Sequence, residues 1–419
     1  MNSQIKFRSR LLLILFPILL ATGNLLTDVI TKSAPIQAAD GVWLGDGTVD
    51  RPYLITSIGD LTKLAADVNS GKSYANTYFM LMADITVIFS GNSPAPLNPT
   101  LPNSTLSINT VWTPIGNINN PFKGNFNGND HRIVGLHTIT FSRPSIDYVG
   151  LFGYLDGGTV KNLYTNNFLV GITNVGSIVG YNKNGIIENC NSDSVINGTT
   201  NVGSIVGYND GGTIRNCNNS GGNIKGSANG TTSGTDYVGG VVGYNKGGIV
   251  ENCFNTGTTS GSSYVGGVVG YNDSGTVKNC YNTGAVSGTS NSGGIVGVNT
   301  NNSSIENCYS TSTMIRFNGI GGVVGNNNNN SAITNCYYNT ENFAGAGIGT
   351  GAAGTATGKT TAEMTTSAFA AVLGTAFGKR ATISDYCYYP ELTVFTPPSF
   401  SIPLNSMQTC NAPYLSRAI

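Results

Sequence analysis

The chain has 419 residues, equal numbers of acidic and basic residues, and charged side chains at only 10% of its positions. Nucleic acids and acidic lipid surfaces attract clustered Lys and Arg, so this composition excludes both as expected partners. Glycine is frequent, at 57 residues, but follows no three-residue period, which excludes a collagen-like triple helix.

Residues 1–39 are predicted to be a signal peptide for export. Three basic residues between positions 6 and 10 precede the apolar run 11–20, which is too short to span a bilayer comfortably. We expect cleavage after Gly23 or near Ala39 and favour the second, because patterned sequence begins at Asp40. A retained membrane anchor is the alternative. Export with cleavage predicts a secreted or cell-surface protein without a transmembrane segment.

Residues 40–148 are predicted to form an N-terminal cap and the first coils of a repeat structure. Ser57 and Asp60 match a helix capping box, and Gly71 is expected to end the helix. The apolar positions of this helix are Leu61, Leu64, Ala65 and Val68. An open stack of strands exposes unpaired edges, so we expect the helix to cover one end of the stack.

Residues 149–340 contain seven repeats, each with a VGxxxGYN-like run followed by an (I/V)xNC-like run. Their anchor glycines are separated by 27, 27, 36, 27, 27 and 28 residues: Gly153, Gly180, Gly207, Gly243, Gly270, Gly297 and Gly325. A fixed period of this size indicates units that stack to bury their apolar faces, and short β-branched runs between Gly and Asn indicate strands and turns. The sequence therefore predicts an all-β fold, a right-handed parallel β-helix of about 27-residue coils with short helical caps at each end.

A charged column supports direct stacking of the coils. The residue after the Ile or Val alternates in sign until the last repeat: Lys161, Glu188, Arg215, Glu251, Lys278, Glu306 and Thr334. Stacked opposite charges attract by roughly 0.2–1 kcal/mol per pair and like charges repel. The alternation is interpreted as a device that fixes the register.

The next column is asparagine in every repeat, and we assign it a structural role. Its members are Asn162, Asn189, Asn216, Asn252, Asn279, Asn307 and Asn335. Asn tolerates left-handed backbone angles and can hydrogen-bond to its neighbours above and below, which suits a bend between strands.

A cysteine column follows, with Leu163 in the first repeat. Its members are Cys190, Cys217, Cys253, Cys280, Cys308 and Cys336. Stacked Cβ atoms lie about 4.8 Å apart, beyond the ~3.5–4.5 Å that a disulfide prefers, so we interpret the column as buried apolar thiols, with some pairing as the alternative. The chain has no CxxC pair and no nearby His for a metal site. Cys387 and Cys410, outside the repeats, are better disulfide candidates.

A tyrosine column supplies the candidate ligand-binding residues. After Tyr154 come Tyr181, Tyr208, Tyr244 and Tyr271. An exposed column could stack on sugar rings, and a buried or half-buried aromatic ladder is the alternative. The paired apolar residues Val241 and Val242 predict either a strand kinked at a glycine or an apolar outer stripe.

Two segments depart from the repeat. The longest unit has nine extra residues near Asn219–Asp236, rich in Gly, Ser, Thr and Asn, and we expect them to leave the stack as a loop. Residues 341–419 are predicted to comprise a Gly/Ala/Thr linker at 343–357, a cap helix and a C-terminal segment. Thr360 and Glu363 match the capping box of that helix.

The chain resembles bacterial exported proteins that carry GLUG-motif repeats. The resemblance rests on the VGxxxGYN units and on two upstream motifs, Trp112–Gly116 and Pro121–Asn129. It implies a β-helical module of the kind found in adhesins, other surface proteins and some immunoglobulin-cleaving metallopeptidases. The resemblance implies a surface or secreted setting and no single activity.

The motifs give no support for catalysis. His131 and His137 lie in a stretch without the Glu of an HExxH zinc motif, so peptidase chemistry is not expected and His131 is assigned a structural role. Polysaccharide cleavage needs clustered carboxylates, whereas Asp193, Asp210 and Asp273 lie in different units. We expect no catalytic residue, cofactor or metal.

The sequence thus predicts a secreted or surface β-solenoid scaffold for adhesion or for binding glycan or protein ligands, without catalysis. The alternatives are a polysaccharide-active β-helix enzyme and a passive structural spacer of the cell envelope.

Overall fold

The computed structural model describes residues 43–88, 106–107, 111–138, 146–221, 232–233, 236–314, 319–352, 354–378, 386–395 and 407–409. The predicted signal peptide and most of the segment 90–109 lie outside this part, as do most of the insertion near 219–236 and Cys410. The unit described below begins at Gly45.

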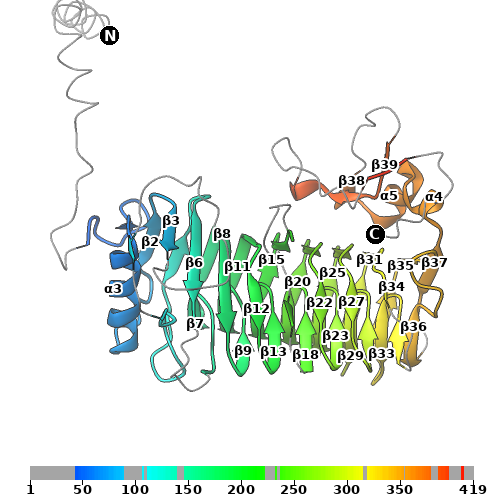
Figure 1. Ribbon diagram of the computed structural model, residues 1–419, viewed down its shortest axis with the longest axis horizontal. Coiled ribbons are helices and arrows are strands. Elements are labelled where there is room, and N and C mark those ends of the chain that lie inside the picture. The colour runs from blue at the N-terminus through cyan, green and yellow to red at the C-terminus, as the bar shows by residue number, and fades with distance from the viewer. Residues whose placement is uncertain are drawn as a thin grey trace, which may run out of the picture. The chain divides into compact units, whose positions relative to one another are not determined.

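The repeats form a parallel β-solenoid, as predicted (Figure 1). Each coil passes through a six-stranded sheet, then an eight-stranded sheet, and then a 23-stranded sheet to which it contributes up to three short strands. The strands of the six-stranded sheet are β9 (Thr173–Val175), β13 (Thr200–Gly203), β18 (Asp236–Gly239), β23 (Ser263–Gly266), β28 (Ser292–Gly293) and β32 (Ile320–Gly321). Those of the eight-stranded sheet are β7 (Phe152–Asp156), β10 (Val179–Lys183), β14 (Val206–Asp210), β19 (Val242–Lys246), β24 (Val269–Asp273), β29 (Val296–Thr300), β33 (Val324–Asn327) and β36 (Ile348–Gly351).

The 23-stranded sheet runs from the first coils to the last. Its N-terminal strands are β1 (Tyr53–Ile55), β2 (Tyr78–Leu81), β3 (Ile85–Ile88), β4 (Leu106–Ser107), β5 (Asn125–Asn127) and β6 (Arg132–His137). The central strands are β8 (Thr159–Val170), β11 (Ile186–Ser192), β12 (Val195–Asn197), β15 (Thr213–Arg215), β16 (Asn218–Asn219), β17 (Thr232–Ser233), β20 (Ile249–Glu251), β21 (Phe254–Asn255) and β22 (Thr259–Ser260). The last are β25 (Thr276–Lys278), β26 (Tyr281–Asn282), β27 (Val286–Ser287), β30 (Ser304–Glu306), β31 (Tyr309–Ser310), β34 (Ala332–Thr334), β35 (Cys336–Asn339) and β37 (Ala356–Lys359).

The register places equivalent residues of successive repeats side by side. Val242 pairs with Val269, 27 residues on, and with Val206 across the longer unit. The longer unit thus keeps the register, and its strand β17 returns to the sheet between β12 and β22. At the corner between β18 and β19, a Cβ on the anchor Gly243 would lie only 2.5 Å from the Val202 backbone nitrogen. Glycine therefore permits this close approach of two coils.

The core is a set of stacked β-branched side chains. Val241 and Val242 are both fully buried, because the chain changes sheets between β18 and β19 and the bend turns both side chains inward. The kinked strand is therefore the correct interpretation at this position, and the apolar outer stripe was wrong there. Burying a Val or Ile side chain stabilises the fold by about 1.5–3 kcal/mol, so the stacked repeats supply much of the stability.

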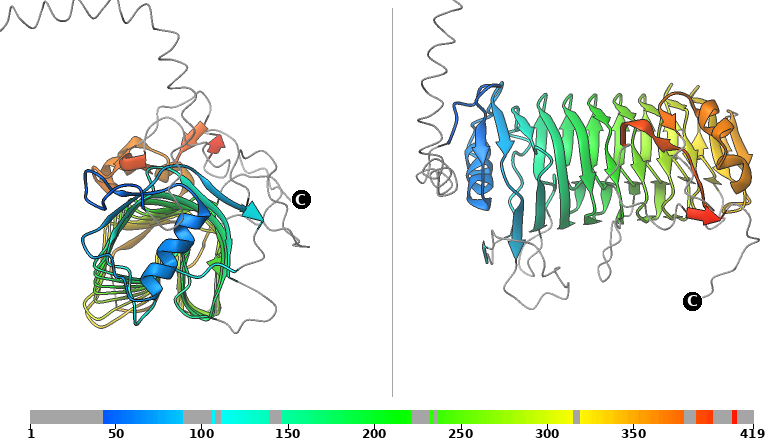
Figure 2. Two further views of the ribbon diagram at one scale, coloured as in Figure 1. Left: turned by 90° about the vertical axis from the view of Figure 1, so that its left-hand side faces the viewer. Right: turned by 90° about the horizontal axis from the view of Figure 1, so that it is seen from above.

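Helix α3 (Ile58–Asn69) covers the N-terminal end of the stack (Figure 2). The predicted capping box is present: Asp60 N donates to Ser57 Oγ at 3.2 Å, and Ser57 N donates to Asp60 Oδ2 at 3.0 Å. The predicted apolar face is buried, with Leu61 and Leu64 fully inaccessible to solvent. The expected N-terminal helix and its orientation are confirmed.

The C-terminal region differs from the prediction in two ways. Residues 343–357 are not a linker, because β36 pairs with β33, and β37 pairs with β35 to continue the stack. The helix expected after Thr360 is broken at Thr366, whose side chain caps a second helix, giving α4 (Thr361–Met364) and α5 (Ser367–Leu373). These helices lie beside the last coils (Figure 2).

The remaining C-terminal strands form two short antiparallel pairs. One joins β38 (Phe377–Gly378) to β40 (Glu391–Leu392), and the other joins β39 (Tyr386–Tyr388) to β41 (Met407–Thr409). A 3₁₀ turn, η1 (Thr393–Phe395), follows β40. The side chains of the disulfide candidates Cys387 and Cys410 lie outside the described part, so that prediction stays open.

Candidate functional site

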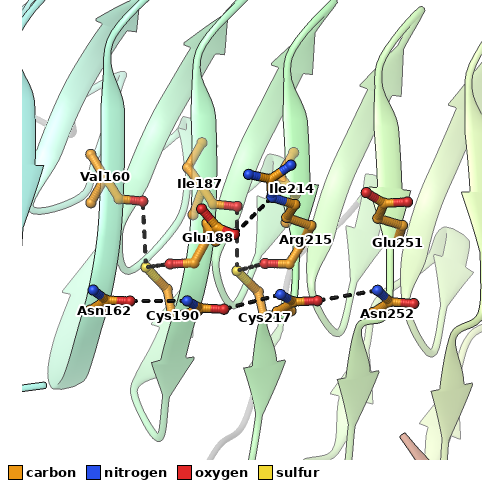
Figure 3. Close-up of polar contacts among 12 residues, drawn as sticks. Val160, Asn162, Ile187, Glu188, Cys190, Ile214, Arg215, Cys217, Glu251 and Asn252 are labelled. Atoms are coloured by element: carbon orange, nitrogen blue, oxygen red, sulfur yellow. Dashed lines mark hydrogen bonds and ion pairs between the residues drawn. The ribbon is translucent and has the colours of Figure 1, made fainter. Parts of the chain in front are cut away.

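The charged column lies in register, as predicted. Glu188 pairs in the sheet with Lys161 and Arg215, and Glu251 pairs with Arg215 and Lys278. Ion pairs close between Arg215 Nε and Glu188 Oε1 at 2.9 Å (Figure 3), and between Lys278 Nζ and Glu251 Oε2 at 2.8 Å. These side chains are part-exposed, so each pair contributes at most about 1 kcal/mol. Opposite charges thus face each other along the column, with Glu188 and Glu251 each paired to a cation.

The outer asparagine column forms a continuous amide ladder (Figure 3). From Asn162 to Asn335, each Nδ2 donates to the Oδ1 of the preceding coil at 2.7–3.3 Å. All seven residues have φ between 51° and 54°, a region in which Asn is favoured over most side chains. The ladder satisfies the amides internally, in agreement with the structural role predicted for this column.

The cysteine column is a row of buried free thiols. Cys190 Sγ lies 3.8 Å from the Val160 carbonyl oxygen of the preceding coil, and Cys217 Sγ lies 3.7 Å from that of Ile187 (Figure 3). Burial raises the pKa of the Cys280 and Cys308 thiols, which keeps them neutral. The described residues contain no group of three or more His, Cys, Asp or Glu side chains placed to hold a metal ion. The six thiols are buried and form no disulfide with one another, and each also contacts backbone carbonyl oxygens.

The tyrosine column, called here the tyrosine ladder, consists of Tyr154, Tyr181, Tyr208, Tyr244 and Tyr271. Successive rings stack with centroids 4.7–4.9 Å apart and planes within 22° of parallel. The side chains are half-buried. Since each inner ring is covered on both faces by its neighbours, a sugar cannot stack on a ring face within the ladder. The half-buried alternative therefore describes this column, and only ring edges and hydroxyl groups face solvent.

A second alternating charged row flanks the ladder on the same strands. It comprises Asp156, Lys183, Asp210, Lys246 and Asp273, which pair in register. Lys246 Nζ lies 3.8 Å from Asp210 Oδ1, and Lys183 Nζ lies 3.8 Å from Asp156 Oδ1. Sequence reasoning missed this row, although the residue after each GYN-like run carries the signal.

The aspartates of this row also accept hydrogen bonds from the ladder. Tyr181 Oη donates to Asp210 Oδ2 at 3.0 Å, and Tyr244 Oη donates to Asp273 Oδ2 at 3.0 Å. Burial and these aspartates raise the pKa of both phenols above its ordinary value. Burial, with the charges of Asp210 and Asp273, raises the pKa of Tyr208 to about 12. The ladder is therefore a row of neutral phenols at physiological pH.

A second tyrosine row packs against the ladder from a left-handed turn of the backbone within β18 and β23 and from the equivalent position of Tyr148. Tyr148, Tyr237 and Tyr264 have φ of 59°, 55° and 58°, a left-handed conformation that costs about 1–2 kcal/mol for most residues. Tyr237 lies across the edges of Tyr244 and Tyr271, with centroids 5.4 and 5.2 Å away. Backbone strain retained by bulky aromatic residues marks this turn as a candidate for function.

The same turn position in other coils holds the residues that a left-handed angle favours. This turn column reads Tyr148, Asn174, Asn201, Tyr237, Tyr264, Asn291 and Gly319, with positive φ throughout. Sequence reasoning missed the second tyrosine row, whose signal is a Tyr two residues before the first Gly of a repeat, as in Tyr237-Val238-Gly239.

A buried amide ladder supports the tyrosine strands from inside. Asn182, Asn209, Asn245, Asn272 and Asn299 are fully buried, and each Nδ2 donates to the Oδ1 of the next coil at 2.7–2.9 Å. Apart from Asn182 Oδ1 at the start of the ladder, which has no partner among the described residues, these amide groups are paired with one another, and paired buried amides rigidify their surroundings. The tyrosine face therefore has a fixed geometry.

The other residues singled out in the sequence do not form a catalytic group. His131 Nδ1 lies 3.1 Å from Asp84 Oδ1, which also accepts a bond from the Arg132 backbone, in agreement with a structural role. Asp193 is buried and accepts hydrogen bonds from Tyr164 and Ser220 on the other side of the coil. Asp210 and Asp273 are two coils apart, on β14 and β24. The structure thus brings none of the three aspartates together.

The comparisons with known proteins agree with this fold. A family model described as the GLUG motif matches residues 198–225, 234–260, 261–287 and 288–314. A protein of Evansella cellulosilytica named "Putative Gly-rich membrane protein" is 30% identical over 145 residues, which are 34% of this chain and 14% of the relative. The match thus spans a small part of that relative's length.

A solved structure is similar over a larger part of the chain. It is the crystal structure of a "putative immunoglobulin A1 protease" from Bacteroides ovatus, 21% identical, with a TM-score of 0.52. The similarity covers 83% of this chain and 94% of that one, and at this identity it supports the fold alone. No helix among the described residues combines the length and apolar character that crossing a bilayer requires.

The repeat period, the register of the strands and the matched family model agree. The GLUG repeats and the solenoid fold fit a surface β-helical protein. This chain is a parallel β-solenoid, and the GLUG-motif model matches four of its repeats, within residues 198–314.

Proposed function

We propose that the protein is a non-catalytic, ligand-binding scaffold at the cell surface, and that the tyrosine face, formed by the tyrosine ladder and the second tyrosine row, is its binding surface. The observation that carries this proposal is the second row, because Tyr148, Tyr237 and Tyr264 retain left-handed backbone angles at positions where other coils have Asn or Gly. A purely structural turn favours Asn or Gly there.

The mechanism is multivalent presentation. The same phenol recurs at each coil spacing on strands held by the buried amide ladder, so weak contacts to a repetitive ligand add up. Tyrosine suits such a surface, since its ring is apolar and its hydroxyl can hydrogen-bond. Glycans and surface proteins are the ligand classes that this chemistry accepts.

The side chains argue against a carbohydrate-active enzyme. Hydrolysis needs one protonated and one ionised carboxyl group flanking the bond. In the tyrosine face, Asp210 and Asp273 are held by tyrosine hydroxyls, and Asp210 also lies near Lys246. A surface location is supported by the predicted signal peptide and by the name of the Evansella relative.

The experiment is a binding assay of the purified exported chain on glycan arrays and whole bacterial or host cells. The matched variant is the triple change Tyr148→Asn, Tyr237→Asn and Tyr264→Asn, which places at each position a residue that other coils carry there. We expect an unchanged fold and at least tenfold weaker binding. Binding by neither protein would favour a passive spacer, and equal binding by both would remove the tyrosine face from the function.

A further inference from the structure

The second tyrosine row is interrupted for two coils beside Tyr208. In the turn column, Asn174 and Asn201 stand between Tyr148 and Tyr237, and the paired residues on either side show that all four occupy equivalent positions. An Asn side chain is shorter than a Tyr side chain. The side chains of the row therefore extend less far from the backbone in these two coils than in the coils that flank them.

The interruption leaves one ladder ring uncovered by the second row. Two second-row rings each contact the ladder ring of their own coil and that of the next: Tyr148 contacts Tyr154 and Tyr181, and Tyr237 contacts Tyr244 and Tyr271. By the same geometry, Tyr208 is flanked by the positions of Asn174 and Asn201. Its outer edge faces two asparagines in place of two aromatic rings.

We propose that this gap, with Tyr208 at its centre, is a binding site for a neutral saccharide, a site that rests on the proposed function of the tyrosine face. The hydroxyl of Tyr208 has no hydrogen-bond partner within the described part of the chain, whereas those of Tyr181 and Tyr244 donate to aspartates. A half-buried phenol with a free hydroxyl can both donate to and accept from a ligand.

The asparagines add polar groups at the same place. Asn201 Nδ2 donates to Asn174 Oδ1 at 2.9 Å, which orients both amides, and within the described ranges no hydrogen bond occupies Asn201 Oδ1, so it can accept from a ligand hydroxyl. Sugar sites combine aromatic surface with a few well-placed polar groups of this kind. The side chains of the gap therefore match the alternating C–H and hydroxyl surface of a pyranose.

The charges near the gap select against an ionic ligand. Asp156, Lys183, Asp210 and Lys246 alternate in sign along these coils. A charged ligand that is attracted by one of these side chains is therefore repelled by the side chain on the next coil. A neutral ligand meets no such penalty. The flanking tyrosines, Tyr148 and Tyr237, are three coil steps apart, about 14 Å at the usual strand spacing, which leaves room for a sugar ring between them.

The decisive variant is Asn201→Tyr, which fills the gap. The backbone accepts tyrosine in this conformation, since Tyr237 and Tyr264 adopt it in the next two coils. The new ring would cover Tyr208 as Tyr237 covers Tyr244. The probes are neutral oligosaccharides on an array (cello-, xylo-, manno- and chito-oligomers), with polygalacturonate as the acidic control.

We expect the unaltered chain to bind at least one neutral oligomer and Asn201→Tyr to weaken that binding at least tenfold with an unchanged melting temperature. Tyr208→Phe, which removes only the hydroxyl, should weaken it about fivefold. The matched control is Asn291→Tyr, which adds a tyrosine to the turn column beside Val298, away from the gap, and should bind as the parent does.

The outcomes separate this site from the function of the whole face. Binding that is lost in the triple Tyr→Asn variant but retained in Asn201→Tyr would overturn the gap site and leave the proposed function standing. Preference for polygalacturonate, or for a protein ligand over every neutral oligomer, would overturn the saccharide assignment. An absence of binding by the parent chain to every one of these oligosaccharides would overturn the saccharide site, whereas the proposed function would fall only if the parent chain also bound no cell in the assay described above.

Discussion

The tyrosine ladder and a lateral aromatic column run along this solenoid with similar spacing, and they meet different surroundings. The tyrosine ladder on the eight-stranded sheet is half-buried and flanked by charges. The lateral aromatic column on the 23-stranded sheet consists of Phe254, Tyr281, Tyr309 and Tyr337; its first three rings stack 4.9 and 5.2 Å apart, and Tyr281 and Tyr309 are buried. The cover comes from the C-terminal segment, which packs Met364, Phe369, Leu373, Phe377, Tyr389 and Leu392 against this column.

Stacking alone does not decide whether an aromatic row lies in the core or at the surface. Residues outside the repeat cover the lateral column. This cover stops at Phe254, the first residue of the column. At the equivalent position, the two preceding coils have Asn191 and Asn218, and Phe395 closes over Phe254 with its ring centroid 4.9 Å away. The ladder has charged neighbours that such an apolar cover would have to desolvate.

The largest expected effect is that of removing a covered ring. Tyr309 is fully buried and its hydroxyl donates to the Pro390 carbonyl oxygen, so Tyr309→Ala should cost about 3–5 kcal/mol. We expect the loss to appear first as faster hydrogen exchange in α5 and β40, measured by mass spectrometry. The matched variant in the ladder, Tyr208→Ala, should cost less than half as much and leave α5 protected. Equal costs would show that the two rows do not differ in burial.

The second prediction concerns the buried asparagine ladders, one of which lies beside the tyrosine ladder and the other beside the lateral column. Asn245, beside Tyr244, accepts from Asn209 Nδ2 and donates to Asn272 Oδ1, both at 2.8 Å. Asn255, beside Phe254, accepts from Asn219 Nδ2 at 2.7 Å and donates to Asn282 Oδ1 at 2.8 Å.

Either Asn→Ala change leaves buried amide groups unpaired, at about 1–3 kcal/mol for each group. Asn245→Ala and Asn255→Ala should therefore lower the urea midpoint by similar amounts, whatever covers the neighbouring ring. Asn252→Gly, in the part-exposed outer ladder, keeps the left-handed turn and should cost less than about 1 kcal/mol. A much smaller effect at Asn245 than at Asn255 would mean that the amide ladder under the tyrosine face contributes little to the free energy of unfolding.

Much of the fold was predictable because it depends on the repeat. The period sets which residues stack, and from that follow the register of Glu251 with Arg215 and Lys278, the left-handed asparagines and the buried thiols. The extra coil at β36 and β37 was not predictable in the same way, since residues 343–357 lack the VGxxxGYN run and were interpreted as a linker. In the stack, the backbone of these residues pairs with β33 and β35, and pairing of backbones requires no particular motif.

The candidate site was predictable only in part. The ladder tyrosines recur at the repeat period, but whether they are covered depends on non-repeating residues such as Phe369 and Leu392, whose position no periodicity gives. The second tyrosine row and the second charged row could have been predicted from the sequence. They required comparison of every column of the repeat, including the columns that hold different residues in different coils, such as Tyr237 and Asn201.

A third, smaller effect follows from the phenol pKa values. The pKa of Tyr208 is raised to about 12 in the fold from an ordinary value near 10. The folded state then holds its proton more tightly than the unfolded state, so the stabilisation is complete below about pH 10 and is lost as pH rises toward 12. Because the side chain is half-exposed, the expected loss is on the order of 1 kcal/mol after screening.

Absorbance at 295 nm and unfolding measured between pH 9 and 12 test this prediction, with Tyr208→Phe as the variant that should lose less stability over this range. The lateral column provides the contrast. Burial raises the pKa of Tyr281 and Tyr309 well above its ordinary value, so these phenols should ionise only when the chain unfolds. A single transition for all tyrosines near pH 10 would contradict the burial of both rows.

The smallest effect is expected from the outward charges, and it separates register from stability. Lys278→Met breaks the ion pair with Glu251, whose atoms are 2.8 Å apart on part-exposed side chains, and should cost less than about 1 kcal/mol in low salt and almost nothing in 1 M NaCl. Glu251→Lys instead places three cations on successive coils, between Arg215 and Lys278, and should cost more than the neutral change Glu251→Gln. The difference between these two Glu251 variants, followed against salt concentration in urea unfolding, measures how strongly the alternation opposes a slipped register. If both cost the same at every salt concentration, the alternating column does not hold the coils in place, and the stacked valines and amides alone fix the register on which both aromatic rows depend.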